Sequence, residues 1–218
     1  MASNERKRQQ KLVRKAAKRK QHVQGIKSAL VKPFSELSPS TQMRRSVDAP
    51  VYECLVPEEL FQAGMGSVVF SRELPGGEIA VVVFLLDVFC LGVKNTLVTV
   101  VPEDEYQSML EQISQHETLA SIDPACTRKL VEEAEAYATD LGFRPHPDYL
   151  VGRMIFGDVD PNACPMSFTF GKDGKPFYAS GPYDTLDKSR RIIDTLTRRC
   201  GPDGFHYMVA LNDPGVEF

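Results

Sequence analysis

The sequence predicts an α+β protein with a mainly antiparallel sheet and about three helices, preceded by a basic N-terminal arm. Two hairpin patterns predict the antiparallel sheet, because alternating strands joined by glycine-containing turns pair with their neighbours in the chain. Strand and helix signals follow one another in mixed rather than strictly alternating order, which is typical of α+β folds. Of the 218 residues, 42% are hydrophobic and 25% are charged, as in ordinary globular proteins.

The clearest hairpin lies in the middle of the chain. Residues 67–74 alternate between apolar and polar, the tripeptide Pro75-Gly76-Gly77 forms a tight turn, and residues 78–88 form a more buried strand. The apolar run at 79–86 has only eight residues, whereas a membrane-spanning helix needs roughly 18.

A second hairpin is expected near the C-terminus. Residues 167–170 and 175–178 would pair around a glycine-rich turn at 171–174. Further strands of the sheet are expected at 52–56, 97–101 and 205–211.

Three helices are predicted from their end signals. Proline near the first position favours helices at 102–115 and 123–141, and Asp123 can cap the second one. Gly142 supplies the C-terminal stop of that helix. A third helix is expected from Asp184, as its N-cap, to Arg199.

The two parts of the chain carry opposite charge. Residues 1–50 contain 13 Lys and Arg and 3 Asp and Glu, whereas the remaining residues contain 13 and 26. We interpret 1–31 as a basic arm, 32–50 as a linker with three prolines and four serines, and 51–218 as a single α+β domain. A basic arm favours binding to a polyanion, because phosphates neutralised by Lys or Arg release their counterions.

The arm also has a thin apolar stripe at helical spacing. The stripe consists of Leu12, Ala16, Val23, Ile26 and Leu30. It is too narrow to fold alone, so the arm is expected to be disordered when free and helical when docked. The candidate nucleic-acid-binding residues of the arm are Arg6, Lys7, Arg8, Lys11, Arg14, Lys15, Lys18, Arg19 and Lys20.

The first functional hypothesis is a non-enzymatic, nucleic-acid-associated protein, related to RNA or the ribosome, whose acidic body binds a protein or sets position. A competing hypothesis is a self-associating module, in which the arm docks on the acidic body in cis or in trans. The two charges are complementary, so docking would weaken with salt.

The segment after the buried strand contains the first catalytic candidates, Asp87, Cys90 and Lys94. In a metal-dependent nuclease, carboxylates hold Mg²⁺ and a lysine stabilises the developing charge. The second carboxylate of such a core is missing, because position 92 is glycine. The structural alternative is a strand end where Cys90 packs inward and Asp87 pairs with Lys94.

His146 lies between two prolines and has Asp148 close enough to orient its imidazole. Together with Cys90 it could form a thiol–imidazole pair, so the alternative function is an enzyme, a hydrolase or nuclease, with a site near Asp87, Lys94 and His146. A histidine in such a loop is more often a hydrogen-bonded structural group. No histidine or cysteine spacing indicates a metal site, and no cofactor is implied.

Five cysteines are spread along the chain without a CxxC pair: Cys54, Cys90, Cys126, Cys164 and Cys200. With no secretory signal in the N-terminal residues, we expect reduced thiols and a cytoplasmic protein. Four arginines on the last predicted helix could extend the footprint of the arm or form a solvated face: Arg190, Arg191, Arg198 and Arg199.

Three segments resemble a group of uncharacterised bacterial proteins. They are V-F-L-L-D-V-F-C-L-G-V-K-N (83–95), G-F-R-P-H-P-D-Y (142–149), and F-G-K-D-G-K-P-F-Y with G-P-Y-D (170–184). Proteins of this group share with the chain a Leu/Val-Asp-x-x-Cys-Leu-Gly-x-Lys stretch, a downstream Gly-Phe-x-Pro-His segment and a closing Gly-Phe-His-Tyr. The resemblance covers about 50–211 and implies one intact domain of bacterial origin, with no activity attached.

Overall fold

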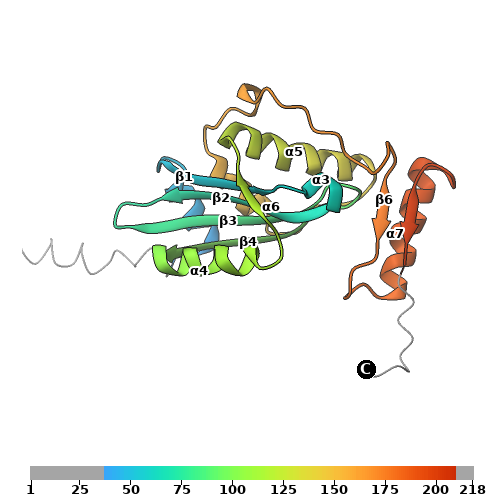
Figure 1. Cartoon of the computed structure of the whole chain (residues 1–218), viewed down its shortest axis with the longest axis horizontal. Helices are drawn as coiled ribbons and strands as arrows, with labels where there is room; N and C mark the ends of the chain where they lie inside the picture. Colours follow the sequence, from blue (N-terminus) through green and yellow to red (C-terminus); the bar gives the residue numbers. More distant parts are fainter. Residues whose placement is uncertain (1–36, 210–218) are drawn as a thin grey trace, which may run out of the picture. The chain divides into compact units, whose positions relative to one another are not determined.

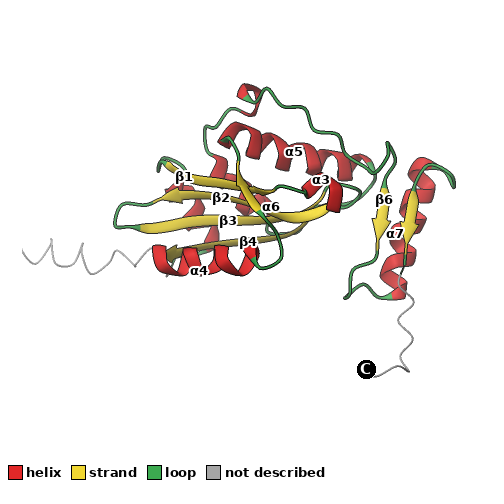
Figure 2. Cartoon of the chain, viewed as in Figure 1, coloured by secondary structure: helices red, strands yellow, loops and turns green. Residues whose placement is uncertain are grey.

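The computed structural model describes residues 37–209. The chain divides into two units, Met1–Leu37 and Ser38–Phe218, and the structure describes the second of them as far as residue 209. Within the second unit the predicted α+β class is confirmed, with a five-stranded antiparallel sheet and a separate pair of parallel strands (Figures 1 and 2).

The strands of the large sheet lie in the order β4-β3-β2-β1-β5, and every neighbouring pair is antiparallel. Their bounds are Val51–Pro57 (β1), Met65–Glu73 (β2), Glu78–Asp87 (β3), Gly92–Pro102 (β4) and Leu119–Ser121 (β5). The predicted central hairpin is confirmed, since β2 and β3 pair along their whole length with Phe70 opposite Val82. Gly76 and Gly77 have φ angles of 116° and 84°, which the turn requires and which glycine adopts without strain.

The three predicted long helices are all present among the described residues. They are α4 (Glu103–Ser114), α5 (Pro124–Asp140) and α7 (Leu186–Cys200). The carboxylate of Asp123 accepts a hydrogen bond of 2.8 Å from the amide of Ala125, as expected of an N-cap. Gly142 follows α5 with a φ of 94°. The structure adds the shorter helices α2 (Pro39–Ser46), α3 (Leu60–Ala63) and α6 (Tyr149–Gly152).

One face of the sheet is covered by α5, α6, α2 and the 3-10 helix η2 (Arg153–Phe156). The side chains that point to this face from the central strands are fully buried; Phe84, for example, stacks on Phe156 at 5.5 Å between ring centroids. Phe70 meets the same ring edge-on at 5.1 Å. We call this side the α5 face.

The opposite side, the α4 face, is covered by α4. Its core contains Val69, Ile79 and Val81 of the strands and Tyr106 of the helix. Figure 1 shows α5 and α4 on opposite sides of the strands. Because successive side chains of a strand point to opposite sides, neighbours such as Leu85 and Leu86 belong to different faces.

The stretch interpreted as a linker contains α2, and here the structure differs from the expectation. Met43 and Ser46 of this helix are fully buried, and α2 packs against α6 and η2. Pro39 at its first position and a single large apolar side chain are sufficient for a short helix once the body provides a surface to pack on. Proline and serine are common both in linkers and at the starts of helices. Their content in residues 32–50 therefore could not distinguish a linker from a short helix.

The second predicted hairpin is wrong. Residues 167–170 form no strand, although the expected turn exists, with Lys172 bridged to Lys175. Instead β6 (Phe177–Ala179) pairs in parallel with β7 (His206–Met208). Parallel strands need a crossover, and α7 between them in sequence provides it. The strand near 205–211 therefore does not close the large sheet.

The expected cap of the last helix is also corrected. Thr185, not Asp184, caps α7, by accepting a hydrogen bond from the amide of Lys188. The Asp184 carboxylate accepts from the amide of Gly181 and the hydroxyl of Tyr178 and pairs with the Lys188 ammonium at 2.6 Å. It stabilises the loop before the helix.

The expectation that all five cysteines are reduced is wrong as well. Cys126, in the first turn of α5, and Cys164 form a disulfide with a Cα–Cα distance of 4.8 Å. The bond closes a segment of 38 residues and ties α5 to the loop that follows η3 (Pro161–Ala163). The other three cysteines are free.

Candidate functional site

Asp87 closes β3 and is buried. One of its carboxylate oxygens accepts hydrogen bonds from the amides of Phe89 (3.1 Å) and Cys90 (2.9 Å). Burial raises the pKa of Asp87, while the nearby Lys94 charge and the backbone amides oppose that rise. This geometry is that of a side chain that holds a tight strand connection, and it leaves Asp87 only 7% exposed.

Cys90 lies in the hydrophobic cluster beneath α7. It is fully buried among Leu141, Tyr178, Leu196 and Phe205. Burial raises the pKa of its thiol, so the thiolate that would act as a nucleophile is disfavoured. The packing alternative considered for Cys90 agrees with this environment.

Lys94 lies at an irregularity of the sheet, where the register between β3 and β4 shifts after Leu85. Its ammonium contacts the sulfur of Met65 at 3.5 Å, at the edge of the α4 face. Lys94 influences Asp87 through its charge, but the described contacts include no ion pair between them.

The loop with His146 reaches the same end of the sheet. The His146 amide donates to the carbonyl of Val93 at 2.9 Å, so the backbone of this loop lies beside the start of β4. The ring nitrogen Nδ1 is 3.3 Å from the amide of Asp148 and 3.8 Å from its carboxylate. The structure therefore brings the two candidate segments together through the backbone, while the printed side-chain contacts of His146 stay within its own loop.

Other candidate residues are placed on the surface or outside the described range. Arg190, Arg191, Arg198 and Arg199 are exposed on α7, where Arg190 lies 3.8 Å from the Asp187 carboxylate. The nine basic residues of the arm lie outside the described residues. Among residues 37–209, no three His, Cys, Asp or Glu side chains gather as a metal site.

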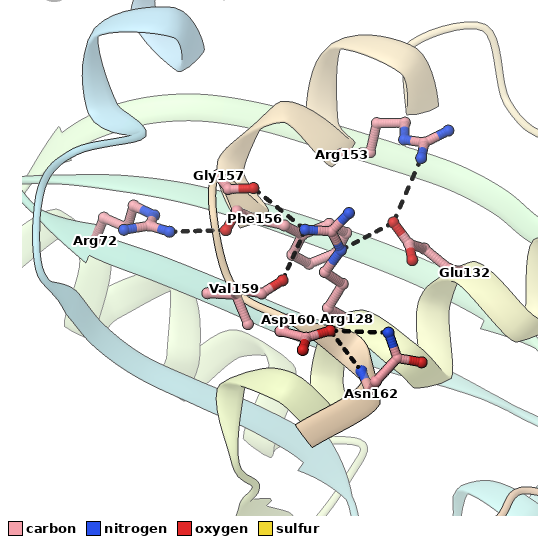
Figure 3. Close-up of polar contacts among 9 residues, drawn as sticks. All are labelled: Arg72, Arg128, Glu132, Arg153, Phe156, Gly157, Val159, Asp160 and Asn162. Atoms are coloured by element: carbon pink, nitrogen blue, oxygen red, sulfur yellow. Dashed lines mark hydrogen bonds and ion pairs between the residues drawn. The ribbon is translucent and has the colours of Figure 1, made fainter. Parts of the chain in front are cut away.

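An arginine network, which the sequence did not suggest, runs from the buried Arg72 to the exposed Arg153 on the α5 face (Figure 3). Arg72 of β2 donates to the carbonyls of Ile155 (2.6 Å), Phe156 (2.9 Å) and Ala49. Arg128 of α5 donates to the carbonyls of Val159 (2.7 Å) and Gly157 (3.2 Å).

The same network includes one carboxylate. Glu132 pairs with Arg128 at 3.0 Å and with Arg153 at 3.4 Å (Figure 3). The guanidinium groups thus satisfy the backbone carbonyls of a segment without regular strands and fasten it to β2 and α5. Arg72 and Arg128 have a structural role here, because their guanidinium groups donate to backbone carbonyls of this segment.

Sequence reasoning did not anticipate a groove on the α4 face. Its volume is about 480 Å³, with an apolar floor formed by Val83, Leu85 and Leu97 and a wall formed by Met109 and Ile113 of α4. At its end, Gln112, His116, Asn95, Ser67 and Glu117 contribute polar groups. Leu97 is 51% exposed, which is unusual for a leucine at the centre of a strand.

A hydrogen bond fixes the residues that follow α4 at the groove. The Glu117 carboxylate accepts a hydrogen bond of 2.8 Å from the amide of Ser67, which holds the residues after α4 against β2. The length of the elements could have indicated the groove: a helix of 12 residues is about 18 Å long, whereas a strand of ten spans about 33 Å. One short helix cannot cover three long strands.

Comparison with family models, curated proteins and solved structures finds no match. Among the described residues, no helix is both long and apolar enough to cross a membrane.

Proposed function

We propose that this protein is a non-enzymatic, nucleic-acid-associated protein, related to RNA or the ribosome, and that the basic arm provides the affinity. The observation that carries the proposal is the division of charge. Residues 1–36 contain 11 Lys and Arg and 2 Asp and Glu, a net charge of +9, whereas 37–209 contain 15 and 25, a net charge of −10. An arm of this charge gains free energy from counterion release, and the acidic body repels the same polyanion.

The environment of the enzymatic candidates supports a non-enzymatic function. The thiol of Cys90 is enclosed in core, and the accepting oxygen of Asp87 is used by two backbone amides. Lys94, half-buried on the edge strand β4, has a methionine sulfur as its hydrogen-bond partner. Asp87 and Cys90 thus have structural roles that account for their positions.

The test is binding of the full-length chain to a single-stranded RNA at several salt concentrations. Affinity should fall by orders of magnitude between about 50 and 200 mM salt if at least six phosphates are contacted. Replacing Lys7, Lys11, Lys15 and Lys18 by glutamine should lower the slope of log K against log salt by about 3.

The matched control replaces four cations of the body outside the α7 arginine cluster by glutamine: Lys129, Arg144, Lys172 and Lys175. This variant changes the net charge of the protein by the same amount as the arm variant. Comparing the two therefore shows whether RNA affinity depends on the lysines of the arm or only on the net charge. The RNA affinity of the control should stay within about twofold of the parent. An equal loss in both variants, or a slope that does not depend on the arm, would contradict the proposal.

A further inference from the structure

The large sheet has two edge strands that differ in length. One edge is β5, which has three residues, whereas the other is β4, which has 11. Short strands, charges and prolines are the usual means by which a protein protects an edge against pairing with another chain. In β4 the only charge and the only proline lie near the ends, at Lys94 and Pro102, and residues 95–101 contain no charge, proline or glycine.

The alternation of the ladder decides which backbone groups of β4 point away from the sheet. The amide of Leu74 donates to the carbonyl of Glu78 at 2.8 Å, so the even-numbered residues of β3 bond to β2 and the odd-numbered ones bond to β4. Val98 and Val100 lie opposite even-numbered residues of β3, so they direct their N–H and C=O groups outward. Within the described residues 37–209, these outward groups have no hydrogen-bond partner.

The free part of this edge has defined ends. At the start of β4 the amide of His146 donates to the carbonyl of Val93 at 2.9 Å, so the loop of His146 occupies the edge there. At the other end Pro102 has no N–H to donate, and α4 begins at the next residue. The open stretch is therefore 95–101, and its middle residue is Val98.

We propose that β4 pairs in antiparallel orientation with β4 of a second copy of this chain, around a two-fold axis at Val98. In this register Val98 exchanges both backbone hydrogen bonds with Val98 of the second copy, and the Val100 amide donates to the Thr96 carbonyl of the second copy. The Thr96 amide can keep its present acceptor, the side-chain oxygen of Asn95 at 2.8 Å. The open stretch is used over its whole length, because its first residue lies opposite its last.

The exposed side chain of Leu97 fits the same register. Leu97 is 51% exposed on the α4 face, although it lies in the middle of a long strand. In the proposed pair it lies opposite Thr99 of the second copy, at a position without ladder hydrogen bonds, where facing side chains come closest. The Leu97 side chains of the two copies are then diagonal neighbours on one face, so each shields the other from water.

The charges at the ends of β4 favour the antiparallel orientation. Lys94 lies near the start of the strand, whereas Glu103, Asp104 and Glu105 directly follow its end. Antiparallel pairing places Lys94 of each copy opposite Pro102 of the other, beside these carboxylates. Parallel pairing would instead bring the carboxylates of both copies together at one end and the two lysines together at the other, which costs free energy.

This inference goes beyond nucleic-acid binding by the arm and does not depend on it. Self-association is measured without RNA, and RNA binding can be measured on variants of β4 that leave the arm unchanged. Failure of one idea therefore leaves the other untouched.

The first experiment measures the mass of the full-length chain by sedimentation over a range of protein concentrations. Leu97→Lys places a charge on the exposed side of the edge and should weaken the dimer at least about tenfold. The matched control is Leu186→Lys, which makes the same change at the start of α7, where the leucine is 49% exposed. The control should dimerise like the parent.

The second experiment removes a backbone donor at the proposed axis. Val98→Pro deletes an N–H that no described residue of the same chain accepts, so the fold should be kept while the dimer is lost. Val98→Ala is the matched control, because it shortens the same side chain and keeps the N–H, and it should still dimerise. Urea unfolding of both variants verifies that they are folded.

The third experiment locates the contact by amide hydrogen exchange of the unlabelled parent at low and high protein concentration. The amides of Val98 and Val100 should exchange more slowly as the dimer forms. The amides of Leu97 and Thr99, which already bond to β3, should change little, and so should those of the opposite edge, β5.

Four outcomes would overturn the proposal. The first is a chain that stays monomeric up to about 1 mM. The second is a dimer that Leu97→Lys and Val98→Pro weaken no more than their controls do. The third is a dimer in which the amides of Val98 and Val100 exchange as fast as in the monomer. The fourth is strong protection of these two amides in a monomer, because another part of the same chain would then cover the edge.

Discussion

The α5 face and the α4 face belong to the same sheet, yet they are built differently. On the α5 face, several helices, a disulfide and an arginine network enclose the strands, and Phe84, Leu86 and Phe156 have at most 1% of their surface exposed. On the α4 face, one helix of 12 residues covers only part of the same strands and leaves Leu97 half exposed.

The closed α5 face contributes to the stability of the fold, whereas the open α4 face has surface available for binding. Apolar surface buried on the α5 face stabilises the fold by about 25 cal/mol per Å². The exposed apolar surface of the α4 face makes no such contribution in the isolated chain, and its contiguity with a groove is typical of interaction sites. Substitutions on the two faces should therefore differ in what they change.

The largest difference is expected for the neighbours Leu86 and Leu85 of β3. Leu86→Ala, on the α5 face, should lower the free energy of unfolding by about 2–5 kcal/mol, because it leaves a cavity in a closed core. Leu85→Ala should cost about 1 kcal/mol or less, because its side chain lies in the open groove. Urea titration of both variants measures the difference. Equal losses would mean that the α4 face is closed in solution.

The disulfide provides the second test of the α5 face. Replacing both Cys126 and Cys164 by alanine should lower the free energy of unfolding by about 2–4 kcal/mol, since the bond closes 38 residues in the unfolded chain. Thiol reduction of the parent should have the same effect, and Cys200→Ala should have none. A parent protein that titrates five thiols after unfolding without reductant would contradict the bond.

Substitutions of Asp87 test the end of the sheet where both faces meet. Asp87→Ala removes the acceptor of two backbone amides and should cost about 1–3 kcal/mol. Asp87→Asn keeps an acceptor oxygen and should be no less stable than the parent at pH 7. If Asp87 instead served catalysis, asparagine would abolish an activity while preserving stability.

The pH dependence of the same variants has a definite sign. Because burial raises the Asp87 pKa above 3.8 in the folded state, the folded protein binds this proton more tightly than the unfolded chain. This contribution to stability is complete below the unfolded pKa and is lost as pH rises through the folded pKa. Asp87→Asn should remove that loss, so its advantage over the parent should grow from pH 4 upward. The exposed Asp140→Asn is the control.

The smallest effect concerns thiol reactivity, which should differ without any change in stability. Burial raises the pKa of Cys54 to about 12 and raises that of Cys90 as well, whereas Cys200 is partly exposed. A chromogenic disulfide reagent should therefore label Cys200 in the native protein and the other two free thiols only after unfolding. Rapid labelling of Cys90 in the native protein would show that the hydrophobic cluster beneath α7 opens and exposes this thiol.

Local signals were sufficient for most elements of the fold. The β2–β3 hairpin follows from an alternating strand, a buried apolar strand and the Pro-Gly-Gly turn between them, and the start of α5 follows from Asp123 and the proline after it. Interactions between residues that are close in sequence decide these elements, so the sequence is enough to predict them.

Elements that depend on distant partners were not predictable in the same way. Parallel pairing of β6 with β7 requires α7 as a crossover, and no local pattern distinguishes this from a hairpin at 171–174. The Cys126–Cys164 bond depends on the approach of two segments, and the burial of Met43 in α2 depends on a surface that other elements create.

By itself, the sequence determined the α+β class, the three long helices, the central hairpin and the opposite charges of the arm and the body, because each of these rests on composition or on neighbouring residues. Only the tertiary structure decided which candidates lie enclosed, which cysteines are joined and which face of the sheet stays open. The physical reason is that burial and approach are sums over contacts between remote segments. The same leucine spacing in β3 fits a closed core on one side and an exposed groove on the other.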